Sequence, residues 1–74
     1  MKIDMGLLRE WLLKRNPQFR TEVRIEVNYL RGVHGTGAYA QAVQHGQDVR
    51  AGFYRRLVAR EAAKQLRSDQ PAAV

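Results

Sequence analysis

The 74-residue sequence contains no cysteine and no long hydrophobic run. Without cysteine there is no disulfide framework, no thiol nucleophile and no thiolate metal site, which fits a reducing compartment. No apolar stretch approaches the roughly 20 residues that a membrane span needs, and the first residues lack the apolar segment of a signal peptide. We therefore expect one small cytoplasmic domain that does not enter a membrane.

Residues that carry catalysis or bind metals are also scarce. The only serine is Ser68, near the C-terminus, and His34 and His45 have no partner ligands at the spacing of a metal site. The glycine-rich stretch 32–37 lacks the spacing of a nucleotide-binding P-loop, and we interpret it as a flexible connection. The sequence therefore predicts a protein that is not an enzyme and that needs no metal and no cofactor.

Acidic residues are few in comparison with basic ones. There are 7 acidic and 13 basic residues, which gives a net charge of +6, and ten of the basic residues are arginines. The planar guanidinium group of arginine pairs with phosphate through two parallel hydrogen bonds, which lysine cannot do. This composition predicts a polyanionic partner.

The clearest local pattern is the stretch F-R-T-E-V-R-I-E-V-N-Y over residues 19–29. Apolar or β-branched residues alternate with charged and polar ones, which predicts a strand with one face on a core. The same stretch also fits a helix in which Asn16 is the N-cap, Pro17 takes the first position and one apolar stripe faces inward. That stripe would contain Phe19, Val23, Val27 and Leu30. We favour the strand because the stretch is rich in β-branched residues.

The other elements are predicted from periodicity and turn composition. Residues 3–15 and 54–67 show the spacing of amphipathic helices, residues 31–37 and 45–48 have loop and turn composition, and residues 38–44 and 49–53 alternate weakly as strands. The predicted fold class is therefore α+β, with a helix, a three-stranded antiparallel sheet and a helix in two layers. A small all-α helical bundle is the alternative. The domain spans residues 1–68, and residues 69–74 form a disordered tail. The expected core contains Leu7, Trp11, Val23, Ile25, Val27, Val58 and Leu66.

The C-terminal helix supplies the strongest functional signal. Its first turn contains Arg55 and Arg56, and a basic stripe without interleaved acids continues along it. Arginines at the start of a helix, together with its dipole, favour binding of backbone phosphates. The predicted nucleic-acid-binding residues are His34, Arg55, Arg56, Arg60, Lys64, Arg67 and Arg9.

The predicted order of elements over residues 3–67 resembles the double-stranded RNA-binding domain. The stretch Gly32-Val33-His34 is similar to the loop of that family that holds a glycine and a histidine, and Arg55-Arg56 is similar to its basic helix start. The resemblance implies that His34 enters a minor groove of duplex RNA and that Arg55, Arg56 and Arg60 hold the phosphates between two minor grooves. It also implies that Arg9 reaches the other minor groove.

These observations lead to two functional hypotheses. The first is a small basic domain, not an enzyme, that contacts the phosphate backbone of duplex RNA or DNA. The second is an accessory protein of a phage or mobile element that binds an acidic host protein and inhibits or redirects it, through Arg20, Arg24 and Arg50 or through Leu13 and Tyr39. A homodimer through an open strand edge is compatible with either. An all-helical structure would strengthen the second hypothesis.

Overall fold

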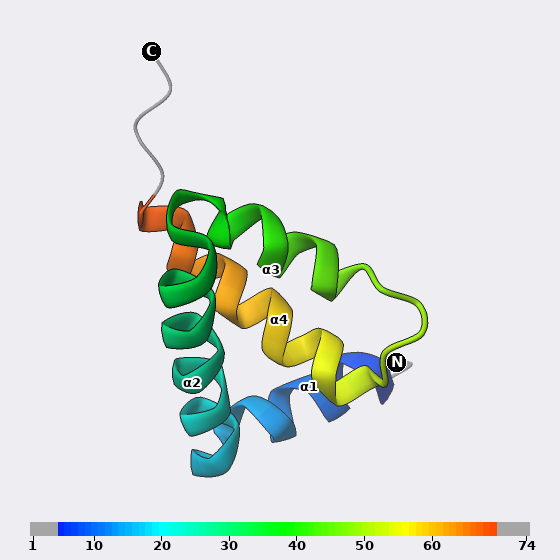
Figure 1. Cartoon of the computed structure of the whole chain (residues 1–74). Helices are drawn as coiled ribbons and strands as arrows, with labels where there is room; N and C mark the ends of the chain where they lie inside the picture. The colour runs from blue at the N-terminus through cyan, green and yellow to red at the C-terminus, as the bar shows by residue number, and fades with distance from the viewer. Residues whose placement is uncertain (1–4, 70–74) are drawn as a thin grey trace.

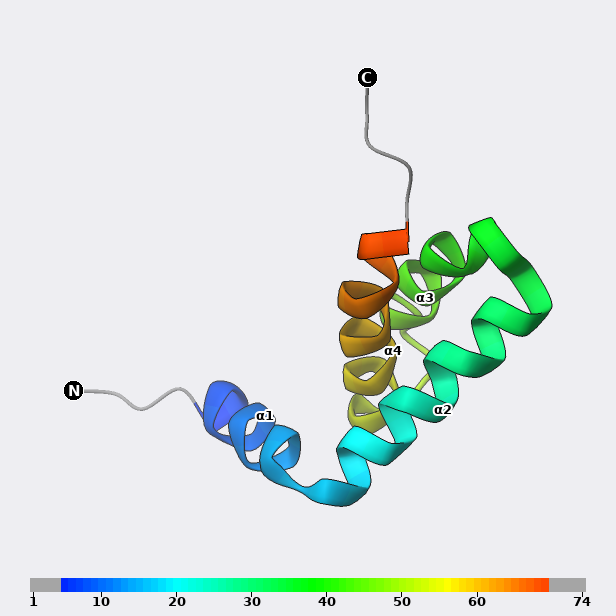
Figure 2. The ribbon, with the colours of Figure 1, turned by 90° about the vertical axis from the view of Figure 1, so that its left-hand side faces the viewer.

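The computed structural model describes residues 5–69, which fold into four α-helices and two short 3-10 helices (Figure 1). The α-helices are α1 (Met5–Arg15), α2 (Pro17–His34), α3 (Ala38–Gly46) and α4 (Phe53–Leu66). The 3-10 helix η1 (Gly35–Gly37) joins α2 to α3, and η2 (Arg67–Asp69) follows α4. Helices α2, α3 and α4 form a compact three-helix bundle, and α1 extends from the start of α2 (Figure 2).

The predicted first strand lies inside α2, so the α+β fold class is wrong and the all-α alternative is confirmed. The helix begins as that alternative requires: Asn16 is the N-cap, and its Oδ1 accepts a hydrogen bond of 2.9 Å from the backbone N–H of Gln18. Pro17 occupies the first helical position, where no backbone N–H is needed. Because residues 5–69 contain no strand, the resemblance to the double-stranded RNA-binding domain is also wrong.

Packing explains why a stretch rich in β-branched residues is helical. The residues that α2 buries recur at helical spacing and are Phe19, Val23, Val27 and Leu30, each at most 3% exposed. In a strand, Ile25 would share the buried face with its neighbours at two-residue spacing, but in α2 it is 59% exposed. Strand propensity is weaker than the burial of a complete helical stripe, so the helix is the more stable structure.

The remaining predicted strands are also absent from the described residues. The segment 38–44 belongs to α3, and the segment 49–53 is the loop between α3 and α4 together with Phe53, the first residue of α4. Small residues on α3 allow a close approach to α4: Ala38, Ala42 and Gly46 are buried. A Cβ atom at Gly46 would lie 3.0 Å from Cγ of Arg60, so this crossing favours glycine.

The C-terminal helix was predicted within one residue of its bounds. Its apolar stripe packs in the core, where the ring of Tyr54 meets that of Phe19 edge to face with 5.9 Å between the centroids. The core prediction is confirmed for Val23, Val27, Val58 and Leu66. It is wrong for Leu7, Trp11 and Ile25, which are all more than half exposed.

Two further expectations concern the ends of the chain and the membrane. The N-terminal helix was predicted from residue 3, and α1 begins at Met5, the first described residue. The predicted tail over residues 69–74 lies outside the described residues, except Asp69, which ends η2. Within residues 5–69, no helix has the length and apolar character that crossing a membrane requires.

Candidate functional site

A cluster of charged side chains fastens α1 to α4. Nζ of Lys14 lies 2.9 Å from Oε1 of Glu61 on α4 and 3.0 Å from Oε1 of Glu10 on its own helix. Nζ of Lys64 lies 3.0 Å from the same Glu61 oxygen. The two acids of this cluster are thus bound by lysines.

The pKa values of this cluster show that its charges stabilise one another. The hydrogen bonds that Lys14 donates to Glu61 and Glu10 raise the pKa of Lys14. For Glu61, burial is the largest single influence and acts to raise the pKa. The hydrogen bonds from Lys14 and Lys64 together outweigh burial, so the pKa of Glu61 lies below its ordinary value. Lys14 and Glu61 therefore stabilise each other's charged form, and their ion pair joins α1 to α4.

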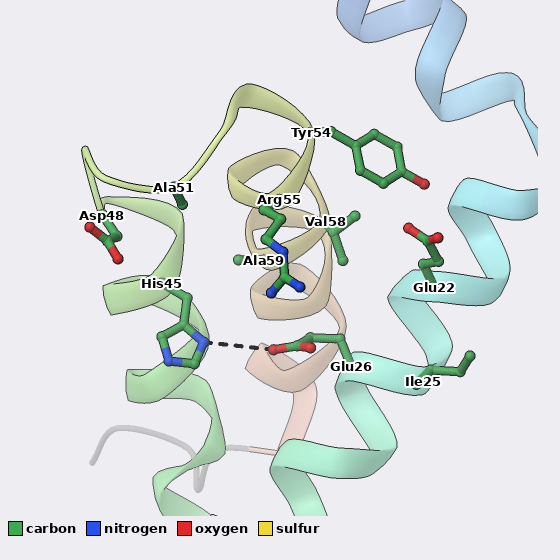
Figure 3. Close-up of a pocket in the computed structure, with 10 residues that line it drawn as sticks. All are labelled: Glu22, Ile25, Glu26, His45, Asp48, Ala51, Tyr54, Arg55, Val58 and Ala59. Atoms are coloured by element: carbon green, nitrogen blue, oxygen red, sulfur yellow. Dashed lines mark ion pairs between the residues drawn. The ribbon is translucent and has the colours of Figure 1, made fainter.

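Three further acidic residues, Glu22, Glu26 and Asp48, line a pocket between α2, α3 and the start of α4 (Figure 3). The pocket has a volume of about 570 Å³, and its polar lining comes from Glu22, Glu26, His45, Asp48, Tyr54 and Arg55. Nδ1 of His45 lies 3.6 Å from Oε1 of Glu26. The hydrogen bond that Tyr54 donates to Glu22, followed by burial, raises the pKa of the Tyr54 hydroxyl.

The pocket combines an apolar wall with side chains of both charges. Val58 and Ala59 contribute an apolar part of its wall, while Figure 3 shows the Arg55 side chain extending from α4 toward the His45–Glu26 pair. No group of three or more metal-binding side chains occurs within residues 5–69. The Glu26–His45 pair was missed by sequence reasoning because the two residues are far apart in sequence and meet only once both are placed on helices.

The structure separates the predicted phosphate-binding residues of α4 into two environments. Arg55 is exposed and lines the pocket together with three carboxylates, none of which lies within ion-pair distance of it. Arg60 and Arg67 are exposed and do not line the pocket. Arg56 is half-buried, and its Nε has no hydrogen-bond partner. The predicted Arg55-Arg56 pair is therefore not one surface.

The other predicted binding residues lie elsewhere on the molecule. Arg9 places its guanidinium carbon 4.5 Å from the centroid of the Phe53 ring, so it packs α1 against the start of α4. Lys64 is bound to Glu61. His34 is exposed and is the last residue of α2. Their proposed contacts with nucleic acid remain predictions.

Several exposed arginines form no ion pair with the acidic side chains that the structure describes. Among the exposed arginines with no ion pair to an acidic side chain that the structure describes, Arg9 and Arg15 stack on aromatic rings and Arg55 lines the pocket. The others, which have neither of these contacts, are Arg20, Arg24, Arg50, Arg60 and Arg67. Arg20 and Arg24 are one turn apart on α2, on a different side from the pocket-lining glutamates. Sequence composition indicated this excess, but not which arginines would lack a partner.

Helix α1 presents its apolar side to solvent and its charged side to the bundle. The exposed fractions of its large apolar side chains are Met5 71%, Leu7 64%, Leu8 37%, Trp11 52% and Leu12 56%. We call these five residues the apolar face of α1. Leu13 is the exception, because it packs against the core from the opposite side. Sequence reasoning missed this face because amphipathicity alone predicts that the apolar side points inward.

Three features of the described chain are thus available to a ligand or partner: the pocket, the exposed arginines and the apolar face of α1. The first two place charge of opposite sign on different parts of the bundle, and the third is nearly free of charge. Comparison with known proteins assigns none of them, since no protein-family model, curated protein or solved structure matches the chain.

Proposed function

We propose that this chain is a small cytoplasmic binding protein, not an enzyme, that contacts the phosphate backbone of duplex nucleic acid. The observation that carries the proposal is the set of exposed arginines that no described acidic side chain neutralises. The glutamates of the described chain bind lysines, a histidine and a tyrosine instead. An all-helical fold alone would favour a protein partner, but this charge arrangement favours a polyanion.

The spacing of the exposed arginines fits a regular array of phosphates. Arg60 and Arg67 are seven residues apart, so they lie on one side of the helical segment at about 10 Å from each other along its axis. That distance corresponds to about three base-pair steps of B-DNA. Arg20 and Arg24 add a second pair on α2, about 6 Å apart along that helix.

The proposal is for binding without reading of base sequence. Guanidinium groups on the outer sides of helices bind phosphate oxygens, and each contact releases condensed counterions. Arg55 is not part of the proposed contact, because three carboxylates surround the pocket that it lines. This difference between Arg55 and Arg60, which lie on the same helix, supplies a matched control.

The test is a binding titration by fluorescence anisotropy with duplex DNA and duplex RNA of mixed sequence, at about 50 mM and 200 mM salt. We expect binding to both duplexes that weakens steeply at the higher salt concentration. Arg60→Gln should weaken binding several-fold, while Arg55→Gln, with the same loss of charge from the same helix, should change it by less than about twofold. Binding that is micromolar or weaker and insensitive to salt, or equal effects of the two variants, would contradict the proposal.

A second candidate function is favoured by an exposed apolar stripe on α2. Ile25, Tyr29 and Val33 follow one another at four-residue spacing, and each is 58–59% exposed. Such a stripe fits a hydrophobic groove of another protein, which matches the hypothesis of an accessory protein that binds a host protein. The Leu13 and Tyr39 side chains proposed for that contact pack against the core instead.

The two functions are separated by capture experiments with and without nuclease. A partner protein that stays bound after nuclease treatment and is lost with Tyr29→Glu would favour the second function. Loss of all captured material on nuclease treatment, with Tyr29→Glu behaving like the unmodified chain, would exclude it.

A further inference from the structure

We propose that the apolar face of α1 is covered by the same face of a second copy of this chain, with the two α1 helices packed antiparallel. The starting observation is that α1 is already fixed on its other side. Lys14 binds Glu61 at 2.9 Å, and Arg9 lies over the Phe53 ring at 4.5 Å. Only Asn16 separates α1 from α2, so α1 cannot rotate to bury its apolar face without breaking these contacts.

The face has the size that a small dimer interface needs. Its five large side chains together expose on the order of several hundred Å², which is comparable to the largest apolar patch of a typical monomer. Two such faces brought together would remove on the order of 1,000 Å² from water, the lower limit for a specific interface. An isologous contact uses the same patch on both copies, so no second surface has to be found.

The charge on the face sets the direction of the two helices. Arg15 is the one charged side chain within this arc of the helix, and its guanidinium group stacks on the Trp11 ring at 4.6 Å. A single stacked cation gives little reason to prefer an acidic partner. A parallel pair of helices would bring the two Arg15 groups together, whereas an antiparallel pair places them at opposite ends. Opposed helix dipoles also favour the antiparallel pair.

The proposal is tested with the full chain, free of nucleic acid, so that its outcome does not depend on the proposed polyanion binding. Sedimentation equilibrium over about 1 to 200 µM should show an increase from the 8.5 kDa monomer to twice that mass. Trp11 is the only tryptophan of the sequence, and it lies in the face. Its fluorescence emission should therefore shift to shorter wavelength over the same concentration range as the mass increases.

Two variants make the test specific to α1. Leu12→Glu should raise the dimer dissociation constant at least about tenfold, while Ile25→Glu, at an equally exposed apolar position on α2, should leave it unchanged. Circular dichroism checks that both variants remain folded, and the milder Leu7→Gln replaces Leu12→Glu if that variant does not fold. A monomer throughout the range overturns the proposal, even if α1 then binds another protein or an anionic vesicle. A dimer that forms without a change in Trp11 emission, or that survives Leu12→Glu, also overturns it.

Discussion

Replacing Val23 with alanine should destabilise the protein by about 2 kcal/mol, whereas replacing Ile25 should change its stability by less than about 0.5 kcal/mol. The two residues are two positions apart. On a strand they would share one face, and on α2 they lie on different sides, with exposed fractions of 2% for Val23 and 59% for Ile25. The pair therefore measures directly whether this stretch is helical.

The magnitudes follow from burial. Val23→Ala removes two buried methyl groups, which is worth roughly 1.6 kcal/mol in transfer free energy, and a cavity in the core adds to this loss. The higher helix propensity of alanine returns up to about 0.5 kcal/mol. Ile25→Ala removes a larger side chain, but most of that side chain is already in water, and the gain in helix propensity offsets the remainder.

The assay is urea unfolding followed by circular dichroism, with protein dilute enough to be monomeric and with equal m-values as the check on two-state behaviour. In thermal unfolding, a difference of 1 kcal/mol corresponds to about 4–8 °C for a domain of this size. Equal losses for the two variants would refute the helical placement of the two side chains.

Three further predictions concern glycines and the ion-pair cluster. Gly32→Ala should stabilise α2 by about 0.5–1 kcal/mol, because no atom lies within 4 Å of the added methyl group. Gly35→Ala should destabilise the protein by about 1 kcal/mol, because Gly35 has a φ of 55°. Urea unfolding measures both changes. Gly46→Val should cost about 1–3 kcal/mol in the same assay, because the α3–α4 crossing has no room for a branched side chain, and a neutral result would contradict that close approach. Glu61→Gln should cost up to about 1 kcal/mol at neutral pH. Since the pKa of Glu61 is lowered in the folded state, its contribution is present above the ordinary glutamate pKa and is lost as the pH falls through the folded value. The difference between the two chains should therefore shrink below about pH 4, and a constant difference would contradict the ion pair.

Local signals at helix ends were sufficient to predict part of the fold. The stop at Asn16-Pro17 and the stripe through Val58 and Leu66 are both present in the structure. The apolar residues around Val23 fit both the two-residue period of a strand and the period of a helix, because charged residues occupy the alternate positions of the sequence and also the outer side of α2. Only the tertiary partners of the stripe distinguish the two, and these are distant in sequence.

The prediction of a strand in the alanine-rich segment of α3 is wrong for a related reason. Alternation of alanine with larger residues imitates a weak strand, although alanine is the strongest helix former. Its function here is close packing, since Ala38 and Ala42 are buried in the core with the alanines of α4.

The candidate surfaces depended on information that the sequence does not contain. Composition predicted excess arginine, but the partners of the acids decide which arginines are unpaired, and Glu61 meets Lys14 only in the folded chain. The outward apolar face of α1 could not be predicted from amphipathicity, because that pattern does not say which side meets the bundle.

The most direct test of the proposed function is the salt dependence of duplex binding for the unmodified chain and for a variant that carries both Arg60→Gln and Arg67→Gln. Each phosphate contact contributes about 0.9 to the slope of log K against log salt concentration, so the double variant should have a slope smaller by about 2. Equal slopes for the two chains, or no measurable binding by the unmodified chain, would contradict the proposal that these arginines hold backbone phosphates.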